Sequence, residues 1–330
     1  MKRASLNDPV ALGGEQRAER LMGLMERNIG YVPGFRRAHA RGIGLRGHFV
    51  ATPAAAELTT AEHMQGATIA VIARLSNGAG SPYAPDRTSE KKGNVLGFGV
   101  RFELPSGGTA QMGALNIKSF PARKPDDFIN LTAARTKGLP FGLPNPVRFV
   151  SYLLSHPVAL GGVKAILGAP TTASFANTTF FGLHAFFAVS PAGERQPFRY
   201  RWIPVAGEAG MTPEENAFLP QLYLLSELRQ RVARGPIAWD LVFSLGEPGD
   251  PTDDLTKAWP DDRPTVTVGR LELDRLHEDQ VALHALVFDP TVLPPGLEPS
   301  NDPVLHFRSA AYTASHKRRS SETKPTITVE

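Results

Sequence analysis

The spacing of hydrophobic residues changes along the chain between two periods, and each period predicts a different kind of element. Eight stretches carry strand-like alternation or short apolar runs bounded by turn residues. These stretches cover about residues 43–50, 68–76, 95–104, 109–117, 180–190, 197–204, 238–246 and 265–273. Residues 104–108 and 191–193 contain the proline and glycine of hairpin turns, so we expect consecutive strands to pair antiparallel.

Helical spacing interrupts these strands. Apolar residues at intervals of three and four predict helices over residues 14–27, 124–136, 145–167 and 212–233, the second and third forming one region with breaks. A last helix is expected from Asp302-Pro303 to about Arg318, because an acidic residue followed by proline is a favourable helix start.

Eight antiparallel strands are enough to close a barrel that fills its own interior. We therefore expect an α+β protein built on an eight-stranded antiparallel β-barrel with helical additions. One domain should span residues 1–318, including an N-terminal helical arm over residues 1–30 and the helix at 303–318. Residues 319–330 are polar and are expected to form a tail.

Composition excludes several classes of protein. The 330 residues are 42% apolar and 21% charged, which is typical of a soluble globular protein. No run of about 18 apolar residues predicts a membrane span. The N-terminus has no apolar core of a secretory signal, so we expect a cytoplasmic protein. There are no cysteines, which excludes disulfides and thiolate ligation of a metal or haem.

The formal charge is +4, and much of the excess lies in residues 36–46 and 316–319. The second of these stretches is interpreted as solvated. Aromatic residues are not interleaved with the basic ones, so nucleic-acid binding is not expected. No amphipathic basic helix is apparent that would favour a membrane surface. His277 and His284 are seven residues apart, and a solvated loop explains them better than a metal site.

Two segments contain residue types suited to redox chemistry. Arg308, Tyr312 and His316 repeat at intervals of four and are expected on one helix face. A phenol must lose its proton to bind ferric iron well, and a guanidinium one turn away stabilises phenolate. On this spacing alone, a surface helix with a buried tyrosine remains the simpler explanation. His39, near the other end of the chain, has an imidazole suited to proton transfer, although a lone histidine is more often structural.

These segments resemble those of the haem catalases. Arg36-Arg37-Ala38-His39-Ala40-Arg41-Gly42 is similar to the family's distal-histidine segment, and residues 308–316 are similar to the segment that supplies its proximal tyrosinate. Ala73-Arg74-Leu75-Ser76 resembles the Arg-Phe-Ser segment. Further similarity to catalases lies at residues 97–102, 125–128, 181–186 and 239–241, and similarity to the short catalase-related peroxidases at 246–251 and 259–264.

The resemblance implies a role for each matching residue on the distal side. His39 would move the proton during peroxide cleavage, and Ser76 would hold the far nitrogen of its ring. Asn116 is the best candidate for the family's distal asparagine, whose amide would polarise peroxide, and Asn94 is a poorer one. Ala38 stands where the family usually has a larger hydrophobic residue.

The resemblance also implies haem b, iron protoporphyrin IX, as the cofactor. Tyr312 would be its iron ligand, with Arg308 beside the phenolate. Arg36 and Arg74 would face the haem propionates. Phe128 or Phe120 would stack on the haem, although either could be part of an ordinary core.

Departures from the family pattern affect the expected activity. Full catalases continue beyond the proximal helix, whereas this chain stops soon after it, and Ala38 is small. Both imply an open pocket and a peroxidase that takes hydrogen peroxide or organic hydroperoxides and a small organic reductant, with weak catalase activity. One alternative is an enzyme that rearranges fatty-acid hydroperoxides, as allene oxide synthases do, and another is a haem carrier or sensor. A homo-oligomer, with a dimer favoured, is expected.

Overall fold

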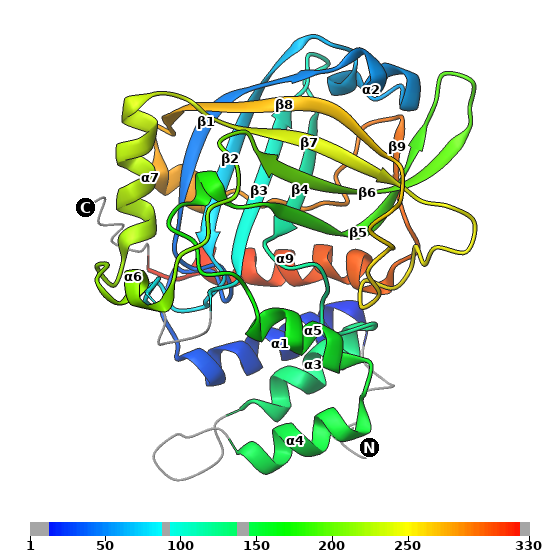
Figure 1. The fold of residues 1–330 in the computed structure, drawn as a ribbon. Helices are drawn as coiled ribbons and strands as arrows, with labels where there is room; N and C mark the ends of the chain where they lie inside the picture. Colours follow the sequence, from blue (N-terminus) through cyan, green and yellow to red (C-terminus); the bar gives the residue numbers. More distant parts are fainter. Residues whose placement is uncertain (1–12, 88–92, 137–144, 324–330) are drawn as a thin grey trace.

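The computed structural model describes residues 13–87, 93–136 and 145–323 (Figure 1). Eight of its strands lie within three residues of the predicted bounds at each end, which confirms those elements. They are β1 (Gly42–Ala51), β2 (Thr68–Asn77), β3 (Leu96–Glu103), β4 (Thr109–Leu115), β5 (Phe180–Val189), β6 (Arg195–Pro204), β7 (Ile237–Leu245) and β8 (Thr265–Leu276).

These eight strands close into a barrel. They pair antiparallel in the order β4-β3-β2-β1-β8-β7-β6-β5, and the pairing of Leu115 with Phe181 joins β4 back to β5. Closure leaves no free sheet edge in the ring, which removes a site of aggregation. The predicted α+β barrel is therefore confirmed. A ninth strand, β9 (Leu297–Pro299), pairs with β5 outside the ring, and its three residues are too few to show a period in the sequence.

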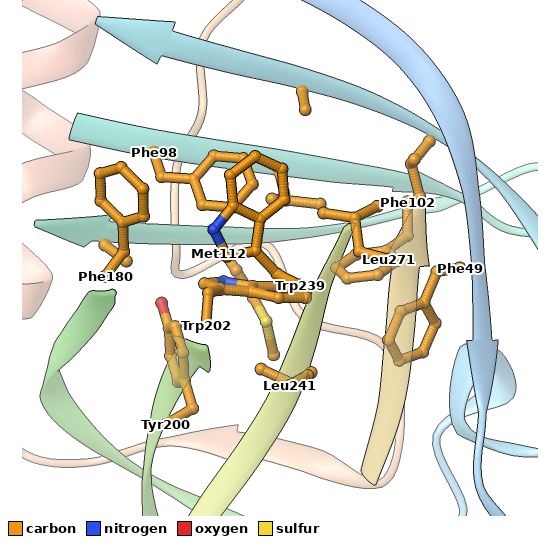
Figure 2. Packing of buried hydrophobic residues seen from close by; sticks show 14 of the residues in the cluster. Phe49, Phe98, Phe102, Met112, Phe180, Tyr200, Trp202, Trp239, Leu241 and Leu271 are labelled. Atoms are coloured by element: carbon orange, nitrogen blue, oxygen red, sulfur yellow. The ribbon is translucent and has the colours of Figure 1, made fainter. Parts of the chain in front are cut away.

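Aromatic side chains fill the barrel interior (Figure 2). Phe98 and Trp239 have ring centroids 4.9 Å apart, and Trp202 lies 5.7 Å from the same phenylalanine ring. All three are at most 2% exposed. The interior is thus a packed core, as expected for a barrel of eight strands, and a functional cavity has to lie outside it.

The helices gather mainly on one side of the barrel (Figure 1). The longer ones are α1 (Gly14–Ile29), α3 (Pro125–Ala134), α4 (Pro146–Ser155), α5 (Ala159–Leu167), α7 (Tyr223–Arg234) and α9 (Pro303–Ser321). The shorter ones are α2 (Pro53–Leu58), α6 (Pro213–Ala217), α8 (Gln280–Ala285) and the 3-10 turns at Glu62–Met64 and Phe175–Asn177. Apolar residues join α1, α3 and α9 into one cluster beneath the barrel. No helix in the described ranges is long and apolar enough to cross a membrane.

The C-terminal basic stretch differs from its predicted form. Helix α9 continues to Ser321, and Arg318 donates hydrogen bonds to Glu19 and Glu26 of α1. Arg319 is only 7% exposed, and Glu322 accepts a hydrogen bond from Arg37. Arg318 and Arg319 are therefore held by contacts and the chain is not a tail as far as residue 322, although Lys317 is exposed. The acidic partners on α1 lie nearly 300 residues earlier in the chain, so the local sequence cannot reveal them. Residues 1–12 and 324–330, which belong to the predicted arm and tail, lie outside the described residues.

Candidate functional site

A cavity of about 290 Å³ lies between the barrel strands β2–β4 and helices α1 and α9. Most of its wall is apolar, and its polar side chains come from a few segments far apart in the chain. Eight of the predicted site residues line it, namely Arg36, Ala38, His39, Arg74, Ser76, Phe128, Arg308 and Tyr312. Asn116 does not line it.

His39 enters this cavity from the loop just before β1. Its Nδ1 lies 3.1 Å from the hydroxyl oxygen of Ser76 on β2. Gly97, the residue paired with Ser76 on β3, lies behind the imidazole. A Cβ at position 97 would come within 2.5 Å of Nδ1, so only glycine leaves room for the ring.

The backbone of His39 has a conformation that side chains rarely adopt. Its φ angle is 52°, the one positive value at a non-glycine residue in the described ranges. Arg74 Nη2 donates to the His39 carbonyl at 2.9 Å, and the His39 amide donates to the Gly78 carbonyl at 3.3 Å. Such strain persists only where neighbouring contacts hold it, and it is common at functional sites.

Burial keeps the imidazole of His39 neutral. Burial first, and then the positive charges of Arg74, Arg308 and Arg36, lower its pKa to about 3. The Ser76 hydroxyl has one hydrogen and directs it at the Gly97 carbonyl, 3.4 Å away. Nδ1 of His39 then has to be the protonated nitrogen, which leaves a lone pair on Nε2 to accept a proton.

Helix α9 presents one face to the cavity. Arg308, Ala311, Tyr312, Ser315 and Arg319 line it, following helical spacing. His316 was expected on the same face but is absent from the lining. Each step of four residues turns a helix by about 40° beyond a full circle, and two steps from Arg308 rotate His316 away.

Arg308 and Tyr312 are directly hydrogen-bonded. Nε and Nη2 of Arg308 lie 2.9 Å and 2.5 Å from the phenolic oxygen. Burial acts to lower the pKa of Arg308, but Tyr312, with smaller contributions from Tyr200 and Asp289, raises that pKa overall. Gly113 on β4 gives the guanidinium its space, since a Cβ there would be 3.1 Å from Nη2. The pair is thus arranged to stabilise a negative oxygen on Tyr312.

Three arginines converge at one part of the wall. Arg36 and Arg319 both donate to the carbonyl oxygen of Leu286, at 2.5 Å and 3.3 Å, while Arg74 donates to the carbonyls of His39 and Ala40. Burial lowers the pKa of Arg74 to about 9 and that of Arg319 to about 10. Burial, then the charges of Arg74 and Arg319, lowers the pKa of Arg36 well below its usual value.

These depressed pKa values show that the arginine cluster lacks counter-charge. No carboxylate of the described residues contributes to stabilising the charge of any of the three. Buried cations are stable only when they are paired. The cluster is therefore suited to a ligand with more than one negative charge. Arg319 was missed in the sequence because it was assigned to the tail.

His284 lies beside this cluster and corrects another expectation. It belongs to α8, its Nε2 lies 2.9 Å from the Gly34 carbonyl, and its Nδ1 lies 3.3 Å from Arg36 Nη1. Burial and the nearby Arg36 lower its pKa to about 3. His284 is therefore a neutral hydrogen-bond partner of Arg36 and not part of a solvated loop. Within the described ranges, no group of three residues could hold a metal ion through histidine, cysteine, aspartate or glutamate.

A buried pair anchors the start of α9. His184 on β5 lines the cavity, and its Nδ1 lies 2.7 Å from Asp302 Oδ2. The other oxygen of Asp302 accepts the Val304 amide at 2.8 Å and caps the helix. The capping role of Asp302 was visible in the sequence, but its pairing with a residue 118 positions earlier was not.

Asn116, the predicted distal asparagine, lies outside the cavity. Its Oδ1 accepts from the Leu96 amide at 2.8 Å, and its Nδ2 donates to the Asn94 carbonyl at 3.0 Å. It is 3% exposed and joins the backbone between β3 and β4. Asn94 in turn donates to the Asp86 carbonyl and is also outside the lining. The neighbouring Leu115 lines the cavity, because successive strand residues face opposite sides.

The two phenylalanine candidates lie together in the wall. Phe120 and Phe128 both line the cavity, and their ring centroids are 5.1 Å apart. The lining as a whole fits the haem that the sequence resemblance implies. A haem needs apolar walls, cationic partners for two carboxylates and an axial ligand, and the cavity offers aromatic rings, three arginines and Tyr312.

Comparison with known proteins finds the same family that the sequence segments resemble. The family model described as Catalase matches residues 24–330. A catalase-related peroxidase of Synechococcus elongatus is 33% identical over 302 residues, covering 91% of this chain and 88% of its own. One of Mycolicibacterium paratuberculosis is 35% identical over 295 residues, covering 88% and 90%. Among solved structures, a bacterial catalase superposes with a TM-score of 0.76 at 25% identity, covering 90% of this chain but only 59% of its own length.

Proposed function

The chain belongs to the catalase family, and on this premise we propose that it is a haem-dependent peroxidase. It is an oxidoreductase of the catalase type. The reaction we propose is reduction of hydrogen peroxide or an organic hydroperoxide by a small organic electron donor, with weak catalase activity. The observation that carries this proposal is that a neutral histidine, an arginine-paired tyrosine and three arginines without a carboxylate partner among the described residues share one cavity.

We propose that this cavity holds haem b. Tyr312 would be the axial ligand, and Arg308 would stabilise its oxygen as the anion that binds ferric iron. Arg36, Arg74 and Arg319 would pair with the two propionates, which would supply the counter-charge that this cluster lacks. Bound haem would supply an iron atom able to exchange electrons with peroxide.

In this proposal His39 moves the proton. Its neutral Nε2 would take the proton from the peroxide oxygen nearer the haem. It would then give that proton to the oxygen farther from the haem, which leaves as water or an alcohol. Ser76 keeps the other nitrogen protonated and fixes the ring orientation. The strained backbone at residue 39, which Arg74 restrains through the carbonyl, holds the ring in the cavity.

The lining supports a preference for organic peroxides. Ala38 contributes only a methyl group beside His39, and Leu115 contributes an apolar side chain where an amide was expected. The small Ala38 side chain would leave space for the hydrocarbon portion of a hydroperoxide, and apolar contact with Leu115 would favour its burial.

One set of assays on purified, haem-loaded protein tests the proposal. We expect a phenolic donor to be oxidised when an organic hydroperoxide is added, with little oxygen release from hydrogen peroxide. Fast oxygen release with negligible donor oxidation would indicate a short true catalase instead. Hydroperoxide loss without a donor would indicate the rearranging enzyme, and haem binding with no turnover in any assay would indicate a carrier or sensor.

A further inference from the structure

Helices α4 and α5 expose an unusual amount of apolar surface. In the described ranges, fourteen large apolar side chains are exposed, and six of them lie between residues 147 and 167. We call these six the apolar ridge; they are Val147, Val150, Leu154, Val158, Leu160 and Leu167. Leu154 is 81% exposed and Val147 is 73% exposed. Scattered exposed leucines are ordinary, but a contiguous apolar surface generally marks a binding site.

The ridge lies on the sides of α4 and α5 that face away from α3. The buried side chains of Tyr152 and Ala159 pack with Leu131 and Ala134 of α3. Val147, Val150 and Leu154 have the spacing of one helix face, on the side that α3 does not cover. In Figure 1, α4 is the helix furthest from the barrel, so the part of the ridge on α4 lies at an outer edge of the molecule.

Within the stretch of chain that carries the ridge the charged residues are all basic, and the Asp127 carboxylate, near Tyr152 of α4, accepts the backbone amides of Arg123 and Lys124. Residues 128–193 contain no aspartate or glutamate. Arg135, Arg148 and Lys164 are exposed within this stretch. The preceding Asp126 is paired with Arg17. A partner for this surface should therefore be both apolar and anionic.

We propose that the apolar ridge seats the protein on an anionic lipid bilayer. Its valine and leucine side chains would enter the boundary between headgroups and acyl chains, and Arg148 and Lys164 would lie against lipid phosphates or carboxylates. A second copy of this chain fits less well. A two-fold contact pairs a surface with itself, so it would bring these cations against one another. The proposal goes beyond the peroxidase function and does not depend on it.

This proposal departs from the expectation from the sequence that no amphipathic basic helix favours a membrane surface. The two helices are short and are separated by a break at residues 156–158, so neither shows a long amphipathic period. Which of their apolar residues α3 covers is also a tertiary property. The sequence shows the apolar residues but not which of them remain exposed.

Sedimentation with lipid vesicles tests the proposal on the full-length, haem-loaded protein. We expect it to bind vesicles containing about one third phosphatidylserine and to bind pure phosphatidylcholine vesicles at least about 10-fold more weakly. The double variant Val147→Asp/Leu154→Asp should reduce binding to the anionic vesicles by at least about 10-fold. Its matched control, Val205→Asp/Phe218→Asp, changes two exposed apolar residues elsewhere and should bind as the parent does.

A second variant pair separates charge from apolar contact. Arg148→Gln/Lys164→Gln should weaken binding to anionic vesicles by roughly 10-fold or more, because each basic residue contributes about 1 kcal/mol near such a surface. Arg234→Gln/Lys257→Gln, two exposed basic residues elsewhere, should not. Failure of the parent protein to bind anionic vesicles would overturn the proposal. So would a parent protein that is a dimer in solution and becomes a monomer in Val147→Asp/Leu154→Asp.

Discussion

Arg308 and Tyr312 face each other across one turn of α9, with Nε of the arginine 2.9 Å from the phenolic oxygen. This contact makes Tyr312 a suitable anionic ligand, because Arg308 lines the same cavity and has a raised pKa. A guanidinium that stays charged under all ordinary conditions stabilises an oxygen anion continuously. The contact also places both groups on a helix that Asp302 caps and His184 anchors.

Replacing Tyr312 with phenylalanine should remove the ligand oxygen without changing the shape of the side chain. We expect Tyr312→Phe to lose haem, or to lose the visible spectrum of high-spin ferric haem with a tyrosinate ligand. Tyr223→Phe is the matched control, since Tyr223 is a buried tyrosine of α7 that hydrogen-bonds the Thr172 carbonyl away from the cavity. An unchanged spectrum in Tyr312→Phe would show that another residue binds the iron.

Removing the imidazole of His39 should slow the reaction with peroxide. For His39→Ala we expect a rate at least about 100-fold lower, the smaller effect of a positioned acid–base group, with haem content nearly unchanged. Stopped-flow measurement of the spectral change on adding peroxide gives this rate. His48→Ala, a partly exposed histidine of β1, serves as the control. A normal rate in the His39 variant would exclude the proton-transfer role.

The pH dependence of the peroxide reaction reports on the environment of His39. Its pKa is lowered to about 3 by burial and by three neighbouring arginines. A lowered pKa keeps the imidazole neutral down to lower pH, and only the neutral form can accept a proton. The rate should therefore show no loss attributable to His39 between pH 8 and about 5. A fall centred near 6.5, the ordinary histidine value, that disappears in the His39 variant would show that the ring is hydrated.

Asn116 should affect stability and not peroxide chemistry. Its amide makes two hydrogen bonds to backbone groups of Asn94 and Leu96, and both would lose their partner in Asn116→Ala. We expect a loss of about 1–3 kcal/mol in the free energy of unfolding, the cost of leaving a buried polar group unpaired. The peroxide rate of the folded variant should stay within about 2-fold of the parent. Normal stability combined with a much slower rate would restore the role implied by the family resemblance.

His63 should destabilise the barrel, most of all in acid. It is fully buried beside Phe102, and neither ring nitrogen has a hydrogen-bond partner among the described residues. Burial lowers its pKa from 6.5 to about 4, so the unfolded chain takes up a proton that the folded chain does not between those values. The free energy of unfolding of the protein therefore decreases as the pH falls from 6.5 to about 4.

The variant His63→Leu should therefore be more stable than the parent. Chemical denaturation should show a gain of about 1 kcal/mol at pH 7, from removing an unpaired polar group. The gain should be about 2 kcal/mol larger at pH 5, because the pH is then 1.5 units below the ordinary histidine pKa. An equal gain at the two pH values would contradict the lowered pKa of His63.

The barrel could be predicted from the sequence because local patterns determine it. In β6, for example, Tyr200, Trp202 and Pro204 are buried and alternate with less buried residues, which is the period of a strand with one covered face. The segments around His39 and Tyr312 were found because the relevant residues lie within a few positions of one another. Their convergence in one cavity required the fold.

The missed parts of the site depend on distant contacts. Arg319 and His284 acquire their place only from packing against residues 34–37 and 285–286. Asn116 shows a different limit. A strand turns successive side chains to opposite faces, so an uncertainty of one residue at the end of β4 exchanges Asn116 for Leu115. The positions at a strand end were the least certain in the sequence, and one of them decided which side chain meets the cavity.

The cavity draws its parts from both ends of the chain, with consequences for the order of protein synthesis. Residues 36–39 are translated before the barrel strands, whereas Arg308, Tyr312 and Arg319 are translated after all eight of them. A nascent chain that lacks α9 has strands β1–β8 but lacks Tyr312, and of the arginine cluster it has only Arg36 and Arg74. The barrel can therefore form before α9 is translated, but the pocket becomes complete only when α9 docks. A ribosome-stalled chain ending before residue 303 should expose the apolar wall of the cavity to chaperones and to solvent.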